Sequence, residues 1–160
     1  MEQGNDSLRY LALGDSYTIG ESVAPGLRYP VQIADSLNER GYFMEPPEII
    51  AVTGWTTGDL KAGINAANPK GPYDLVSLLI GVNNQYRGMD IDIYRKEFGE
   101  LIDQSISFAG NDTGRVIVIS IPDWGVTPFA SGRDREKIAR EIDQYNAVKK
   151  EITISRGVVW

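Results

Sequence analysis

The sequence lacks two residue types on which many enzymes depend: its 160 residues include no cysteine and no histidine. Without cysteine the chain has no disulfide bond, no thiolate nucleophile and no zinc–thiolate site. Histidine is the usual general base of hydrolases and the commonest transition-metal ligand. A serine hydrolase with this composition is therefore incomplete, inactive or dependent on another base.

Clustered positive charge and long apolar runs are missing as well. The formal net charge is -6 and no run of lysine and arginine occurs, which argues against nucleic acid as a partner. No apolar stretch approaches the length of a membrane span. Residues 1–7 are polar and lack the basic and apolar regions of a signal peptide. The compartment stays open: we expect a soluble protein, either cytoplasmic or exported with its signal removed.

Apolar runs alternate with amphipathic stretches along the chain, as in a single α/β domain over residues 1–160. The apolar runs predict five strands, over residues 8–13, 48–52, 74–80, 115–121 and from 158 onward. The amphipathic stretches predict helices over about 29–40, 57–67, 91–109 and 133–156. Parallel strands joined by right-handed helical crossovers form a three-layer α/β/α sandwich, here with a parallel five-stranded sheet.

The last expected strand, residues 158–160, has only three residues before the sequence stops. A strand inside such a sheet needs a helix to cover it. We therefore expect the 160 residues to be a domain truncated at its C-terminal end.

Three expected strand ends carry groups suited to catalysis: Ser16 after the first strand, Gly54 after the second and Asn83 after the third. The carboxyl ends of parallel strands meet at one edge of the sheet, where ligands bind. Ester hydrolysis needs a nucleophile and hydrogen-bond donors for the developing oxyanion. The Ser16 hydroxyl is the candidate nucleophile. The Ser16 and Gly54 amides and the Asn83 side chain are the candidate donors to the oxyanion. Each residue taken alone is equally typical of a turn.

The blocks Gly14-Asp15-Ser16-Tyr17, Gly54 and Gly81-Val82-Asn83-Asn84, each after an expected strand, resemble the first three blocks of the SGNH (GDSL-type) esterases and lipases. The resemblance covers residues 10–160. It implies a flavodoxin-like strand order 2-1-3-4-5, Ser16 as nucleophile, and Gly54 with Asn83 as the rest of the oxyanion hole. It implies no cofactor and no metal.

The sequence departs from that family in two places. Asn84 stands where the third block usually has aspartate, at a position we expect to be structural. The family's last block, Asp-x-x-His, supplies the base and its orienting acid after the fifth strand, and the sequence stops before it. Truncation explains this better than mutation, because the missing strand cover and the missing histidine fall in the same place.

Several other residues have a structural and a functional interpretation. We expect Asp15 to brace its loop, and Asp123 to form a turn rather than act as a catalytic acid. Trp55 and Trp124 either line the substrate cleft or cover the sheet ends, with equal weight. Tyr17 is expected to pack against the first helix. The acidic pair at positions 90 and 92 is expected to start a helix rather than bind metal.

Together these observations predict a serine esterase acting on a small acyl ester, in which the 160 residues alone have little activity. One alternative is an esterase-like module that binds an acylated or sugar ligand without chemistry. Another is a flavodoxin-like anion binder, which is weaker because no glycine-rich phosphate loop is present. The acyl and alcohol specificity and the oligomeric state stay open.

Overall fold

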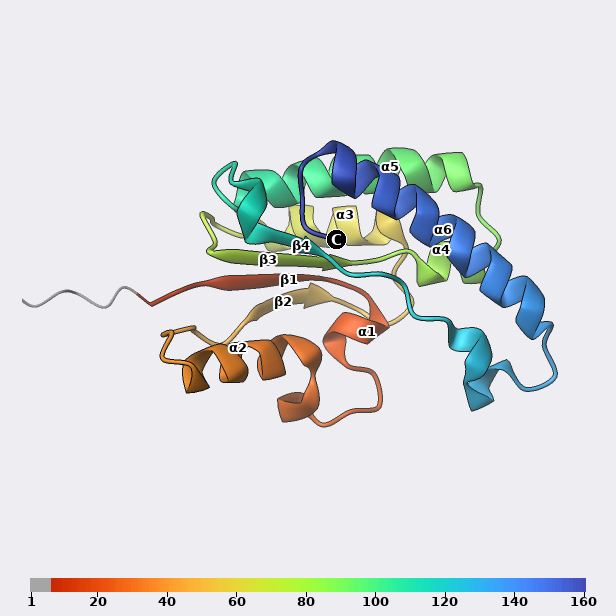
Figure 1. The fold of residues 1–160 in the computed structure, drawn as a ribbon, viewed down its shortest axis with the longest axis horizontal. Coiled ribbons are helices and arrows are strands. Elements are labelled where there is room, and N and C mark those ends of the chain that lie inside the picture. The colour runs from red at the N-terminus through yellow and green to blue at the C-terminus, as the bar shows by residue number, and fades with distance from the viewer. Residues whose placement is uncertain (1–6) are drawn as a thin grey trace, which may run out of the picture.

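A parallel sheet forms the centre of the molecule. The computed structural model describes residues 7–160, so residues 1–6 of the polar N-terminal stretch lie outside it. The sheet has the order β2-β1-β3-β4, and every pairing in it is parallel (Figure 1). The strands are β1 (Tyr10–Gly14), β2 (Glu48–Ala51), β3 (Leu75–Leu79) and β4 (Val116–Val118).

Helices cover both faces of this sheet, which confirms the expected three-layer α/β architecture. They are α1 (Ser16–Ile19), α2 (Tyr29–Glu39), α3 (Thr57–Ala67), α4 (Val82–Tyr86), α5 (Ile91–Phe108) and α6 (Arg135–Ser155). Helix α2 lies on one face, and α3 and α5 lie on the other (Figure 1). Successive side chains of a strand point to opposite faces, so β1 contributes to two cores. Leu11 and Leu13 join the large core with α3, α5 and α6, whereas Tyr10 and Ala12 join the small core under α2.

The expected fifth strand is wrong, because the sheet has four strands. Gly157 ends α6 in a left-handed conformation, with φ of 68°, and Val158 turns into the core. Val159 alone then pairs with Ile117 of β4 in an isolated parallel bridge, and its carbonyl accepts from the Val118 amide at 2.9 Å. One bridge does not make a ladder, although its position next to β4 is the one that the order 2-1-3-4-5 assigns to a fifth strand.

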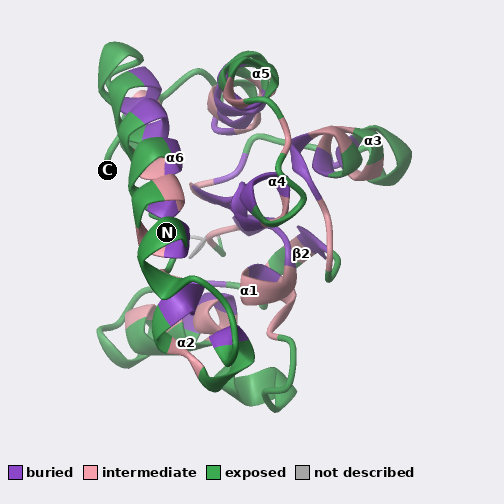
Figure 2. Cartoon of the chain, turned by 90° about the vertical axis from the view of Figure 1, so that its right-hand side faces the viewer, coloured by how far each residue is buried: buried purple, intermediate pink, exposed green. Residues whose placement is uncertain are grey.

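The helices follow their sequence signals closely. Thr56 caps α3 through a reciprocal capping box with Asp59. Leu60 and Ile64 form the buried face of α3, whereas Ala67 is exposed because it occupies the last position of the helix. The buried residues of the long helices α5 and α6 lie along the side of each helix that faces the centre of the molecule (Figure 2).

The passage from β1 into α1 depends on Gly14. A Cβ atom at this position would lie 2.0 Å from Oγ1 of Thr18 and 2.5 Å from the Leu79 carbonyl oxygen. Only glycine therefore lets β1 pack against β3 and turn directly into α1. In the part of the chain that the structure describes, no helix has the length and apolar character needed to cross a bilayer.

Candidate active site

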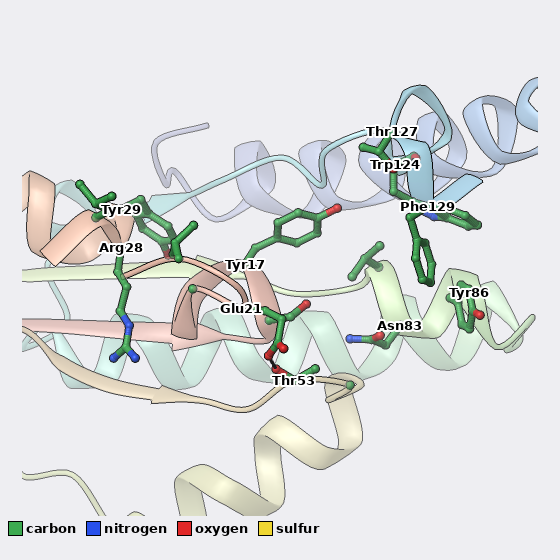
Figure 3. Close-up of a pocket in the computed structure, with 16 residues that line it drawn as sticks. Tyr17, Glu21, Arg28, Tyr29, Thr53, Asn83, Tyr86, Trp124, Thr127 and Phe129 are labelled. Carbon is green, nitrogen blue, oxygen red and sulfur yellow. Dashed lines mark hydrogen bonds between the residues drawn. The ribbon is translucent and has the colours of Figure 1, made fainter. Parts of the chain in front are cut away.

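The three residues singled out at the strand ends line one pocket. Ser16 at the start of α1, Gly54 after β2 and Asn83 in α4 border a cavity of about 660 Å³. The pocket lies at the carboxyl edge of the sheet, where parallel α/β folds bind their ligands. In Figure 3, Tyr17 and Asn83 lie in the middle of it, between Arg28 and Tyr29 at one end and Trp124 and Phe129 at the other.

Ser16 is held at this edge by the residue before it. Asp15 is fully buried and caps α1, because its Oδ1 accepts a hydrogen bond from the Tyr17 amide at 3.0 Å. The expected bracing role of Asp15 is thereby confirmed. Ser16 is half-buried and is the first residue of the helix. The first amides of a helix have no carbonyl partner within it, so the Ser16 N–H is available to an oxygen in the pocket.

Gly54, after β2, borders the pocket in a backbone conformation that favours glycine. Its φ is 87°, within a turn in which the Trp55 amide donates to the Val52 carbonyl at 3.2 Å. Arg87 fixes the turn from outside, since its Nη2 donates to the Gly54 carbonyl at 2.6 Å. This bond fixes the orientation of the peptide that follows Gly54, and the turn places its backbone against the pocket without a side chain.

Asn83 connects the third strand end to that turn. Its Nδ2 donates to the Trp55 carbonyl at 2.9 Å, which uses one of the two amide hydrogens. The neighbouring Asn84 is fully buried and binds Thr57 twice, through the Thr57 amide at 3.0 Å and hydroxyl at 2.8 Å. Asn84 thus ties α4 to the start of α3, which confirms its expected structural role.

One end of the pocket is an aromatic wall, of which the sequence marked only Trp124 as a candidate for the cleft. Tyr86, Trp124 and Phe129 surround one another with ring centroids 5.5 to 6.1 Å apart. Arg133 lies against all three rings and donates to the Tyr86 hydroxyl at 2.9 Å. Tyr86 belongs to α4, a five-residue helix without an apolar period, so no sequence signal marked it. Phe129 lies in a single 3₁₀ turn, Pro128–Ala130, which is too short to give a helical period.

The remaining marked residues divide between the two interpretations. Trp124 lines the pocket and is also buried over the sheet end, whereas Trp55 packs against the large core and covers Gly63. Tyr17 packs against the large core and also lines the pocket. Asp123 accepts from the Gly125 amide at 2.7 Å, which confirms the expected turn.

Electrostatics at this edge are set by two buried groups. Burial raises the pKa of Asp15 to about 6, an effect opposed by the Tyr17 amide and by the charge of Lys149. Burial also lowers the pKa of Lys149 to about 7, opposed by the charge of Asp15. Position 149 lies on the buried stripe of α6, seven residues after Ile142, so a lysine on an apolar face was the available sequence signal.

Metal ligation has no support among the described residues, since no group of three or more acidic side chains in residues 7–160 is placed to hold an ion. Asp90 instead caps α5, with its side chain accepting from the Asp92 amide at 2.8 Å, which confirms the expected helix start.

Comparisons with known proteins identify the family and the fold. The profile of the GDSL-like lipase/acylhydrolase family matches residues 12–160. The fold is similar to that of AlinE4, an SGNH-hydrolase family esterase, with a TM-score of 0.72 and 18% identity over 96% of this chain and 75% of AlinE4. TesA gives a TM-score of 0.71 and 16% identity over 94% of this chain and 75% of TesA.

An extracellular lipase from Streptomyces rimosus gives a TM-score of 0.67 and 21% identity, over 96% of this chain and 79% of the lipase. A comparison with curated protein sequences yields no match. The family match extends over nearly the whole sequence and includes all three strand ends of the pocket. The chain therefore belongs to the GDSL-like lipase/acylhydrolase family.

Proposed function

We propose that this chain is the nucleophile-bearing part of a serine esterase that cleaves small acyl esters. The observation that carries the proposal is that Ser16, Gly54 and Asn83 line one pocket at the carboxyl edge of the sheet. The family match and the esterase folds of its neighbours support the same reaction class.

In the proposed reaction the Ser16 hydroxyl oxygen attacks the ester carbonyl carbon and gives up its proton to a base, or to solvent water where no base is present. The carbonyl oxygen takes up negative charge. The Ser16 and Gly54 amides and the free N–H of the Asn83 side chain donate to that oxyanion. Collapse of the tetrahedral intermediate breaks the ester C–O bond, and the leaving alkoxide takes a proton. Water then hydrolyses the acyl-serine and regenerates the hydroxyl.

A proton acceptor of the usual kind is not among these residues, because the sequence contains no histidine. Asp15, the nearest carboxyl in sequence, is fully buried and already bonded to the Tyr17 amide. The 160-residue polypeptide is therefore proposed to hold an assembled oxyanion site with a weakly activated serine. A triad enzyme that loses its base keeps roughly 10³- to 10⁴-fold acceleration over water.

The test compares two proteins, the 160-residue polypeptide and the product of the complete reading frame that contains it. p-Nitrophenyl acetate hydrolysis is measured for each, together with labelling by a fluorophosphonate and mapping of the labelled residue. The proposal expects labelling at Ser16 and a much faster reaction in the complete product. Equal rates contradict the missing-base account, and labelling elsewhere contradicts Ser16 as nucleophile.

A second candidate, a binding module without chemistry, is favoured by the same lack of histidine. It predicts that the complete product binds an ester or sugar ligand but neither hydrolyses it nor reacts with the fluorophosphonate. The labelling experiment therefore separates the two candidates.

A further inference from the structure

Lys149 is the one lysine among residues 7–160 whose side chain is completely buried, and neither the family match nor the proposed reaction uses it. It projects from α6 and donates to two backbone carbonyls, that of Ile119 at 2.6 Å and that of Ile80 at 3.3 Å. Ile119 is the residue directly after β4, and Ile80 is the residue directly after β3. The ammonium group thus joins the carboxyl ends of two neighbouring strands.

Both carbonyls belong to segments that shape the pocket. Ile80 precedes Gly81 and the helix α4 that carries Asn83, and its carbonyl also accepts from the Tyr94 hydroxyl at 3.2 Å. The segment after Ile119 leads to Trp124 in the aromatic wall. If Lys149 is displaced, the two backbone segments that carry Asn83 and Trp124 are therefore expected to shift as well.

The end of β1 lies beside a carbonyl that Lys149 binds, because Gly14 of β1 pairs with Leu79 of β3 and the next residues are Asp15 and Ile80. Asp15 ends the passage from β1 into Ser16, is fully buried, and uses only Oδ1 to cap α1. Its Oδ2 is buried, and among the described residues it has no hydrogen-bond partner. The positive charge of Lys149 is the cation that favours ionised Asp15, and Asp15 is the anion that favours protonated Lys149.

The other titratable groups that act on Asp15 are three tyrosines, which are uncharged near neutral pH. Tyr17, Tyr29 and Tyr94 are coupled to Asp15, and burial raises the pKa of all three above the ordinary tyrosine value. Asp123 acts on Tyr17 from the loop after β4, and the Phe98 ring centroid lies 5.6 Å from Nζ of Lys149. Ionisation near pH 6 to 7 is therefore confined to Asp15 and Lys149 within this cluster.

We propose that Lys149 is a positioning residue for the Ser16 edge of the pocket: it fastens the ends of β3 and β4 and compensates the charge of Asp15, whose carboxylate caps the helix that begins at Ser16. This rests on the proposed role of Ser16. A buried ammonium group and a buried carboxylate that compensate each other's charge are costly to desolvate, and removing one of them leaves the other uncompensated.

The titration of this pair then reaches Ser16. Below about pH 6 Asp15 takes up a proton and accepts more weakly from the Tyr17 amide, while Lys149 stays charged. Above about pH 7 Lys149 is neutral and Asp15 loses its compensating charge. The Ser16 amide therefore experiences two ionisation steps that originate behind the pocket.

The test follows the Ser16 amide by ¹H–¹⁵N NMR between pH 4 and 9, a measurement that needs no activity. The expected result is two inflections in the wild-type protein, loss of the upper one in Lys149→Met, and loss of the lower one in Asp15→Asn. Asn is as good a helix cap as Asp, so we expect Asp15→Asn to fold. This variant keeps the test available if Lys149→Met does not fold. Lys150→Met is the matched control, because Lys150 is exposed on the same helix, and it keeps both inflections.

A second control separates this coupling from general loosening of α6. Asn146 also fastens α6 to the segment after β4, through the Ile121 amide at 2.8 Å and carbonyl at 2.9 Å, but carries no charge. Asn146→Ala is expected to keep both inflections. A Ser16 amide that does not titrate, or that keeps its upper inflection in Lys149→Met, overturns the proposal.

Fluorophosphonate labelling of Ser16 in the complete reading-frame product adds the link to reactivity. Lys149→Met is expected to slow labelling about tenfold at pH 6.5, the effect of losing one charge-assisted hydrogen bond, and by less at pH 9, where Lys149 is neutral in the wild type. A wild-type protein that titrates at Ser16 but is never labelled contradicts the proposed function and leaves the role of Lys149 standing. A slowing that is the same at both pH values overturns that role.

Discussion

The side-chain amide of Asn83 donates a hydrogen bond to the backbone carbonyl of Trp55 at 2.9 Å. This contact joins α4, which follows β3, to the turn after β2, so two walls of the pocket form a single unit. The same side chain that we propose as an oxyanion donor therefore also sets the position of the Gly54 turn next to it.

Replacing Asn83 with alanine is expected to lower kcat for ester hydrolysis in the complete reading-frame product about 10²- to 10³-fold, the usual effect of losing one oxyanion donor. The physical reason is the loss of an amide N–H aimed at charge that develops in the transition state. The measurement is p-nitrophenyl acetate turnover. Asn65→Ala is the control, since Asn65 is exposed in the middle of α3, and an equal loss in both variants contradicts the role of Asn83.

Gly54→Ala tests the backbone of the turn after β2. An alanine with φ near 87° costs about 1–2 kcal/mol of stability, and a Cβ there lies 3.8 Å from Nη2 of Arg87, which is ordinary contact. Gly41 has nearly the same φ of 89° and open space around it, so Gly41→Ala is expected to cost a similar amount in urea unfolding. Only Gly54→Ala is expected to slow Ser16 labelling; equal labelling rates contradict a role for Gly54 in the pocket.

Gly14→Ala tests the packing of β1 against β3. The new Cβ would overlap Oγ1 of Thr18 and the Leu79 carbonyl, so we expect the free energy of unfolding to fall by about 3 kcal/mol or more. Thermal unfolding followed by circular dichroism measures it. Gly26→Ala meets no atom within 4 Å and is expected to leave the melting temperature nearly unchanged. A stable Gly14→Ala protein means that β1 and α1 do not pack as described.

Stability is expected to rise with pH above neutrality because of Lys149. Its pKa is about 7 in the folded chain and 10.5 as the ordinary lysine value, so between these the unfolded state binds more protons. The stability that comes from keeping Lys149 neutral is fully present above pH 10.5 and is lost as the pH falls through 7. Between these values the free energy of unfolding changes by at most about 1.4 kcal/mol per pH unit. Urea unfolding at pH 7, 8 and 9 measures the slope. It is expected to disappear in Lys149→Met and persist in Lys150→Met; persistence in both contradicts the assignment.

Phe129→Ala tests the aromatic wall. Phe129 lines the pocket yet is 67% exposed, so a substrate that covers it gains apolar contact. We expect kcat/KM of the complete product to fall about tenfold for a long-chain p-nitrophenyl ester and little for the acetate. Phe43→Ala is the control, because Phe43 is 59% exposed and does not line the pocket. An equal fall for both esters indicates that the wall does not contact the acyl chain.

The elements with strong local signals could be predicted from the sequence. The apolar run before Gly14 became β1, and the nearly all-apolar run before Gly81 became β3. Helix α4 could not be predicted, because five residues give no helical period and its start depends on the burial of Val82. The fifth strand was wrong because pairing needs more than one aligned residue, and only Val159 reaches β4.

The sequence by itself determined which polar groups follow which strands, because strand ends are marked locally by glycine and by the end of an apolar run. It therefore placed Ser16, Gly54 and Asn83 at one edge of a parallel sheet. Only the tertiary structure decided what surrounds them. The packing of Tyr86 against Trp124 and Phe129, and the bonds of Lys149 to two strand ends, join residues that are 30 to 69 positions apart. Such contacts depend on how the layers pack.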